Sequence, residues 1–185
     1  NVLQLPPHKV GITMTSIPLT IFIIAPIAGR LSDKYGSTIL STLGLAVLCS
    51  VLTWIGIPGL GLAPENTPKL FIALAFVGVG IGLFQSPNNN AIMGDVGPKH
   101  LGVASALIAT VRNLGLVSGS ALSTTLLMHF YAKEVSLKGA LSSSSNSFIC
   151  AMQSTMLSTA AICSLGVIVS LLRGKGSSKI RESRQ

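Results

Sequence analysis

The residue with the most demanding chemistry in this sequence is Arg112, a cation inside a long run of otherwise uncharged residues. A guanidinium at the centre of a membrane-spanning helix costs about 2.5 to 3.5 kcal/mol on insertion scales, so it requires a partner or a watery cavity. The candidate partners are the amides of Asn88, Asn89 and Asn90 and the carboxylate of Asp95. Because the guanidinium has five N–H donors, amide and backbone carbonyls can satisfy it without a counter-charge. We therefore expect these residues to form a polar site.

The composition defines the kind of element that must hold such a site. Hydrophobic residues make up 49% of the chain and charged residues 10%, and the mean hydropathy is +0.67. Soluble domains carry about 25% charged residues, so the composition excludes that class. The formal net charge of +8 would, taken alone, suggest a protein that binds nucleic acid. Basic residues beside apolar stretches are instead typical of membrane topology, so we expect a lipid bilayer and no nucleic acid as partner.

Long stretches with few or no charges indicate where the helices lie. A bilayer core about 30 Å thick needs about 20 apolar residues in helical form. Five segments approach or exceed this length, at about 10–28, 38–57, 70–85, 101–130 and 148–172, and a basic tail follows at 173–185. The sequence therefore predicts an all-α polytopic membrane protein with about five transmembrane helices.

The distribution of Lys and Arg predicts the orientation of these spans. Five spans place two groups of basic residues on opposite sides of the membrane. One group has eight members, Arg30, Lys34, Lys99, Arg173, Lys175, Lys179, Arg181 and Arg184, and the other has four, Lys9, Lys69, Lys133 and Lys138. Because cytoplasmic loops carry the excess of Lys and Arg, we expect the larger group and the C-terminus in the cytoplasm of a multi-pass cell membrane protein.

Small residues recur at helical spacing in two of the spans. Gly78 and Gly82 form one Gly-x-x-x-Gly pattern, Gly115 and Gly119 form another, and each is followed by a serine four residues later. Such a smooth stripe lets two membrane helices approach closely and gain dispersion contacts. Both patterns predict helix packing within the bundle, which is favoured over a dedicated dimer interface.

The segment GRLSDKYG between the first two spans combines glycines with charges. Gly29 and Gly36 permit tight backbone turns. Asp33 stands between Arg30 and Lys34, close to helix ends whose dipoles it can complement. The sequence predicts a short, sharply turned loop here, in the cell interior.

This segment resembles the GxLxDrxGrk loop of the major facilitator superfamily, which occurs between the second and third helices of each six-helix half. The matching positions are Gly29, Leu31, Asp33, Lys34 and Gly36, whereas Ser37 and Thr38 replace the basic pair that often follows. A longer stretch, GLFQSPNNNAIMGDVGPKHLGVASALIATVRNLGLVSG at 82–119, is similar to the corresponding region of the 14-helix drug:proton antiporter subfamily. The second resemblance is the more discriminating of the two.

The resemblance implies a place in a larger protein. The five spans would be helices two to six of the C-terminal six-helix half, with the first helix of that half and the N-terminal half absent. The glycine-and-aspartate loop is understood as a conformational latch in this superfamily. That implies a pairing of Asp33 with cationic or helix-end groups in one access state. Alternatively, Arg30 and Lys34 enforce topology and Gly29 and Gly36 allow the turn.

The role of Arg112 stays open between three readings. It is a structural hydrogen-bond hub at the cytoplasmic gate, a participant in substrate or proton coupling, or the partner of a group in the absent half. Proton coupling most often uses a desolvated carboxylate. No Asp or Glu lies at the depth of Arg112 in the sequence, so we expect the coupling carboxylates in the absent half.

Catalytic and metal chemistry find little support. The three cysteines, Cys49, Cys150 and Cys163, have no metal-site or CxxC spacing. Serines and threonines inside the spans lack a paired His and acid. We expect no enzyme, no metal site and no cofactor, with a proton gradient as the driving force.

Together these features predict a secondary active transporter for proton-coupled efflux of drugs or other small amphipathic organic molecules by alternating access. Two alternatives remain: a major facilitator carrier for a native metabolite, and a non-transporting membrane scaffold subunit.

Overall fold

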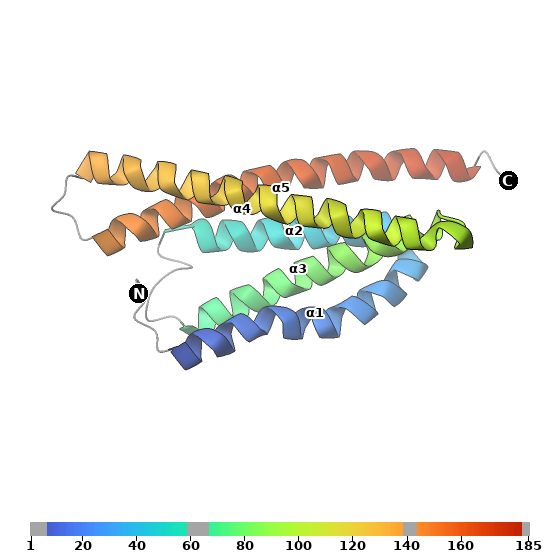
Figure 1. Ribbon diagram of the computed structural model, residues 1–185, viewed down its shortest axis with the longest axis horizontal. Helices are drawn as coiled ribbons and strands as arrows, with labels where there is room; N and C mark the ends of the chain where they lie inside the picture. Colours follow the sequence, from blue (N-terminus) through green and yellow to red (C-terminus); the bar gives the residue numbers. More distant parts are fainter. Residues whose placement is uncertain (1–6, 59–66, 139–143, 183–185) are drawn as a thin grey trace.

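The computed structural model describes residues 7–58, 67–138 and 144–182, and these ranges are helical almost throughout (Figure 1). The long helices are α1 (Pro7–Tyr35), α2 (Ser37–Gly56), α3 (Thr67–Gly94), α4 (Leu101–Lys138) and α5 (Ser144–Glu182), and a 3-10 turn, η1 (Pro98–His100), precedes α4. Successive long helices run in alternating directions, so connections alternate between the two ends of the bundle. The predicted all-α polytopic fold is confirmed.

Each long helix provides all or most of a segment long and apolar enough to cross a membrane, and the fourth segment begins in η1. These segments are Val10–Tyr35, Ser37–Gly56, Pro68–Gly94, Pro98–Ser136 and Ser147–Leu171. Each overlaps one of the predicted spans. Helix α5 continues to Glu182, so residues 173–182 of the expected tail extend that helix, and residues 183–185 lie outside the described ranges.

The prediction of a loop at residues 29–36, between the first two spans, is wrong for all but the last of these residues. Helix α1 continues through Arg30 and Lys34 to Tyr35, and Gly36 is the single non-helical residue before α2. Gly36 has φ of +90°, and its N–H donates to the carbonyl of Ser32 at 2.9 Å. Arg, Leu and Lys are good helix formers, so nothing between residues 30 and 34 stops the helix. One glycine with a positive φ, which residues with a side chain rarely adopt, is enough to end it.

The polar segment after the third predicted span is also helical. We expected that span to end at residue 85, yet α3 continues through Pro87 and the three asparagines to Gly94. Pro87 is fully buried inside the helix. Membrane helices tolerate such a proline where neighbouring groups satisfy the freed carbonyl. As a result, Asn88, Asn89 and Asn90 point to different sides of a helix rather than forming a cluster in a loop.

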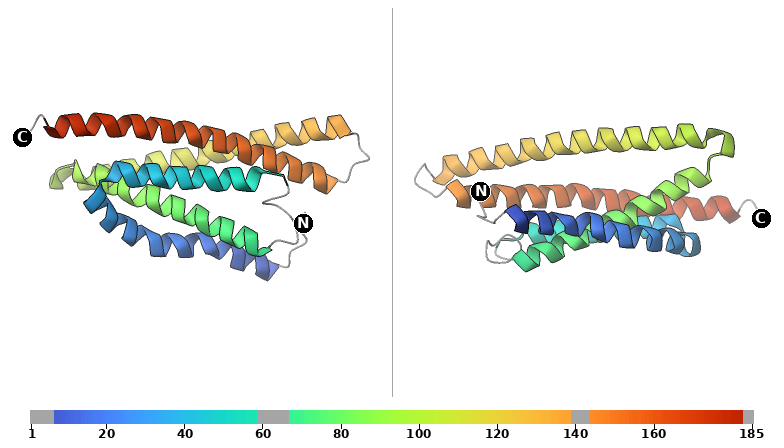
Figure 2. Two further views of the ribbon diagram at one scale, coloured as in Figure 1. Left: turned by 180° about the vertical axis from the view of Figure 1, so that it is seen from behind. Right: turned by 60° about the horizontal axis from the view of Figure 1, so that its bottom comes forward.

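The bundle has a close-packed side and an open side. Helix α3 packs along both α1 and α2, and α2 packs along α5. Helix α4 packs mainly along α5 and meets α3 only slightly, and Figure 2 shows it standing apart from α1. A small core of Val51, Ile55 and Ala73 joins α2 to α3, with Met152 of α5 packed against it. Most of α4 is consequently exposed within this chain.

Candidate functional site

A cavity of about 680 Å³ lies between α3 and α4. This volume falls in the range of about 300 to 1,000 Å³ that small-molecule sites occupy. Its wall is mostly apolar, with Phe84 and Leu107 among the residues that line it. The polar lining residues are Gln85, Asn88, Asn89 and Arg112. An apolar wall with a few polar groups is the usual composition of a site for an organic ligand.

Arg112 reaches this cavity from deep within the predicted membrane span. Each helical residue adds about 1.5 Å, so Arg112 lies about 16 Å from the start of α4 at Leu101. Counted from the start of the predicted span at residue 101, this is about half of a hydrocarbon core about 30 Å thick. The side chain is exposed to the cavity, and no hydrogen bond or ion pair joins it to another described residue. A charge at this depth requires the cavity to contain water or a polar partner.

The structure brings together part of the polar site expected from the sequence. Asn88 and Asn89 line the cavity with Arg112. Asn90 is exposed and faces α1, where a Cβ added to Gly29 would lie 3.7 Å from its Nδ2. Asp95 follows the end of α3, is exposed, and is not among the lining residues. The polar lining therefore consists of one cation and neutral amides. Gln85, one turn before Asn89, completes it, and the sequence analysis missed this residue.

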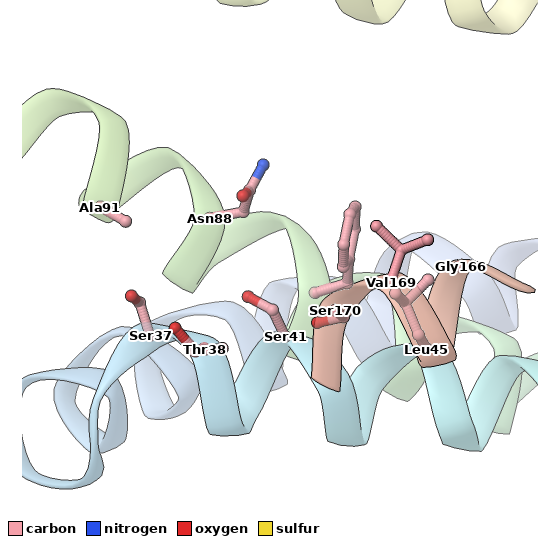
Figure 3. A pocket seen from close by; sticks show the side chains of 10 residues that line it. Ser37, Thr38, Ser41, Leu45, Asn88, Ala91, Gly166, Val169 and Ser170 are labelled. Carbon is pink, nitrogen blue, oxygen red and sulfur yellow. The ribbon is translucent and has the colours of Figure 1, made fainter. Parts of the chain in front are cut away.

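A second cavity, of about 430 Å³, lies where α2, α3 and α5 meet. Figure 3 shows the hydroxyls of Ser37 and Ser41 pointing from α2 toward the segment of α3 that carries Asn88. Ser41 is only 7% exposed, and its hydroxyl makes no hydrogen bond to another described residue. Close by, the hydroxyls of Thr42 and Ser170 lie 2.6 Å apart and join α2 to α5. Phe84 and Asn88 line both cavities.

The charged end of α1 lies at the same end of the bundle as the start of α2. Arg30, Asp33 and Lys34 are all exposed, and Lys34 Nζ lies 5.3 Å from the centroid of the Tyr35 ring. That distance is within the range of a cation–π contact. Among the described residues, no ion pair joins Asp33 to a cation. The latch contact expected for Asp33 stays a prediction.

The first Gly-x-x-x-Gly stripe lies in the interface between α3 and α1. A Cβ added to Gly78 would lie 2.8 Å from the carbonyl oxygen of Ile17, and one added to Gly82 would lie 3.1 Å from Cγ2 of Ile24. At the end of the same seam, a Cβ on Gly29 would lie 3.4 Å from Oγ of Ser86. Small residues thus let the two helices approach along three successive turns of α3.

The second stripe lies on the open side. No atom of the described chain, apart from the local helix itself, lies within 4 Å of a Cβ added to Gly115 or Gly119. Gly115 is four residues after Val111, which lines the cavity, so the stripe continues the cavity face of α4. The packing role predicted for this pair stays a prediction.

One close approach was not foreseen from the sequence. A Cβ added to Gly44 of α2 would lie 2.6 Å from the backbone nitrogen of Phe84 and 2.7 Å from the carbonyl oxygen of Gly80. The backbones of α2 and α3 are therefore in direct contact at this point. Both glycines were visible in the sequence, but nothing in their spacing indicates that they face each other.

These features define a class of protein: a multi-pass helical membrane protein with a ligand-sized cavity at membrane depth. Comparison with known proteins is more specific. The Major Facilitator Superfamily profile matches residues 1–184, and the chain belongs to that family. This places the chain among transporters rather than enzymes.

Curated relatives agree with this family. The chain is similar to the riboflavin transporter RibZ of Clostridioides difficile, with 32% identity over 170 residues, which is 91% of this chain and 35% of the relative. It is similar to the uncharacterized transporter YebQ of Escherichia coli, with 34% identity over 66% of this chain and 26% of the relative. A multidrug resistance protein B homolog of Mycobacterium tuberculosis shares 26% over 70% of this chain and 24% of its own length. The chain thus spans 24% to 35% of the length of these relatives.

Proposed function

We propose that the complete polypeptide is a secondary active transporter that exports drugs or other small amphipathic organic molecules in exchange for protons. In this proposal the chain supplies five helices of the C-terminal half of a 14-helix antiporter, and an N-terminal half supplies the other wall of the pathway. The observation that carries the proposal is the cavity between α3 and α4, which Arg112 lines about 16 Å along α4 from its start. The short share of each relative that the chain covers supports the larger size.

Alternating access gives each part of the site a role. The cavity binds the substrate near the membrane midplane, and the exposed face of α4 moves against the other half. Asp33, on the last turn of α1, engages a cationic or helix-end group in one access state and releases it in the other. Its position three residues before Gly36, which separates α1 from α2, supports this role. The excess of Lys and Arg predicted for this side of the membrane supports a cytoplasmic location for this end of the bundle, in a protein of the cell membrane.

The experiment is a flux measurement on the complete polypeptide in proteoliposomes with an imposed pH gradient. Riboflavin and ethidium serve as probes, since relatives are named for riboflavin transport and for multidrug resistance. We expect probe flux that stops when the gradient is collapsed by an ionophore. Arg112→Ala should lower riboflavin flux, and Asp33→Ala should lower the flux of both probes, each at least about tenfold, because each removes a charged interaction that contributes about 1.5 to 3 kcal/mol.

Val117→Ala is the matched control for Arg112→Ala. Val117 lies on α4, is 68% exposed and does not line the cavity. Its flux should equal that of the wild type. Wild-type flux in both Arg112→Ala and Asp33→Ala, at equal protein in the membrane, would remove the roles assigned to these residues.

A carrier for a native metabolite is the second candidate, and the similarity to a riboflavin transporter favours it. Flux of riboflavin without flux of ethidium would establish that alternative. A protein that moves no probe under either polarity of the gradient would instead support a non-transporting membrane scaffold.

A further inference from the structure

The charge balance of the cavity between α3 and α4 is one-sided. Arg112 is a permanent cation, and Gln85, Asn88 and Asn89 are neutral amides. Three acidic residues have described side chains, Asp33, Asp95 and Glu134, and none of these three lines this cavity. A cationic substrate entering here would meet a like charge, with no carboxylate among the described lining residues.

No acid on the same helix can neutralise Arg112. Glu134, the acid on α4, follows Arg112 by 22 residues, which at about 1.5 Å per residue places it about 33 Å along the axis. Asp95 lies beyond the end of α3 and is exposed. The guanidinium therefore presents its N–H donors to the cavity without a competing partner among the described residues.

We propose, on the basis of the transport function above, that this cavity takes a substrate with an apolar aromatic body and an anionic or strongly hydrogen-bond-accepting oxygen group. Arg112 binds that group, and the amides of Asn88 and Asn89 donate to neighbouring acceptor oxygens. The apolar body lies against Phe84 and Leu107, which line the same cavity. Arg112 thus selects acidic or neutral oxygen-rich molecules over organic cations.

The alternative partner of the Arg112 guanidinium is a carboxylate from another part of the polypeptide. The two possibilities differ in substrate dependence. If Arg112 pairs with a carboxylate of the protein, replacing Arg112 breaks that ion pair whichever substrate is present, so the flux of all substrates should fall alike. If Arg112 instead binds an oxygen group of the substrate, replacing Arg112 should lower the flux only of substrates that carry such a group.

The test uses two dyes with the same tricyclic xanthene body and opposite charge, fluorescein as the anion and rhodamine 123 as the cation. Flux of each is measured in proteoliposomes containing the complete polypeptide, as wild type, Arg112→Gln and Arg112→Lys. We expect the wild type to prefer fluorescein, and Arg112→Gln to lose fluorescein flux about tenfold or more while rhodamine 123 flux is retained or rises. Arg112→Lys keeps the charge and should recover part of the fluorescein flux.

Equal loss of both dyes in Arg112→Gln, or a wild type that prefers rhodamine 123, would overturn the proposal. Fluorescence anisotropy of each dye with the detergent-purified protein separates this result from failure of the transport function. Binding of fluorescein that Arg112→Gln weakens about tenfold, in a protein without proton-linked flux, would contradict the function and support the recognition. Binding of fluorescein that is unchanged in Arg112→Gln would overturn the recognition whether or not flux occurs.

Discussion

Helices α3 and α4 carry the same spacing of small residues, yet the two stripes lie in different surroundings. Gly78 and Gly82 are pressed against α1, so that an added Cβ would meet backbone or side-chain atoms at about van der Waals distance or closer. Gly115 and Gly119 face open space and continue the wall of the cavity. The spacing therefore permits close approach but does not determine whether a helix of this chain uses it. In the first case the stripe builds the scaffold, and in the second it leaves a smooth face beside Arg112.

The largest effect is expected where the two backbones touch on the close-packed side. In Gly44→Ala the new Cβ would overlap Phe84 and Gly80 backbone atoms at 2.6 and 2.7 Å, and no side-chain rotation can relieve this. We expect a loss of about 1 to 3 kcal/mol in the free energy of unfolding, as for overpacked cores. Unfolding by SDS titration of the detergent-purified protein measures it. An unchanged midpoint would show that α2 and α3 are not in contact there.

A smaller effect is expected at the interface of α1 and α3. The Cβ introduced by Gly82→Ala would lie 3.1 Å from Cγ2 and 3.3 Å from Cβ of Ile24, so a shift of a few tenths of an ångström relieves the contact. We expect a loss of at most about 1 kcal/mol in the same titration. A loss larger than that of Gly44→Ala would reverse the ranking of the two interfaces.

The smallest effect on stability is expected on the open face. Gly115→Ala meets no atom within 4 Å in the described chain, and alanine favours helix over glycine by up to about 1 kcal/mol. The unfolding midpoint of the 185-residue chain should stay the same or rise slightly. A clear fall would mean that a partner covers this face, and the contrast between the two stripes would then disappear.

The sequence was sufficient to predict the helices. Their uncharged runs are long, and a membrane span leaves few alternatives to a helix. The breaks between helices were predicted less well, because GRLSDKYG and SPNNN look like loops in a soluble protein. In a membrane helix, a residue such as Pro87 is tolerated when neighbours bury it.

The candidate site was predicted in its chemistry rather than its geometry. The cost of a charge in lipid singled out Arg112, and the search for partners found Asn88 and Asn89. Asn90 and Asp95 were included because they are the other polar side chains close in sequence to the end of the third predicted span. Because residues 86–94 continue helix α3, adjacent residues point about 100° apart, and Gln85 rather than Asn90 shares the cavity face. The contact of Gly44 with Gly80 depends on how α2 and α3 cross, which no single stripe reveals.

The central claim is that the face of α4 carrying Arg112 lines a water-filled pathway and that its opposite face does not. Ile108 lines the cavity, whereas Ala106, two residues and about 200° away around the helix, does not. The measurement is the rate at which a membrane-impermeant maleimide modifies Ile108→Cys and Ala106→Cys, each in the complete polypeptide in membrane vesicles with Cys49, Cys150 and Cys163 replaced by serine. Because the reactive thiolate forms in water and not in lipid, Ile108→Cys should react about tenfold faster or more. Equal rates, or faster reaction of Ala106→Cys, would contradict the account.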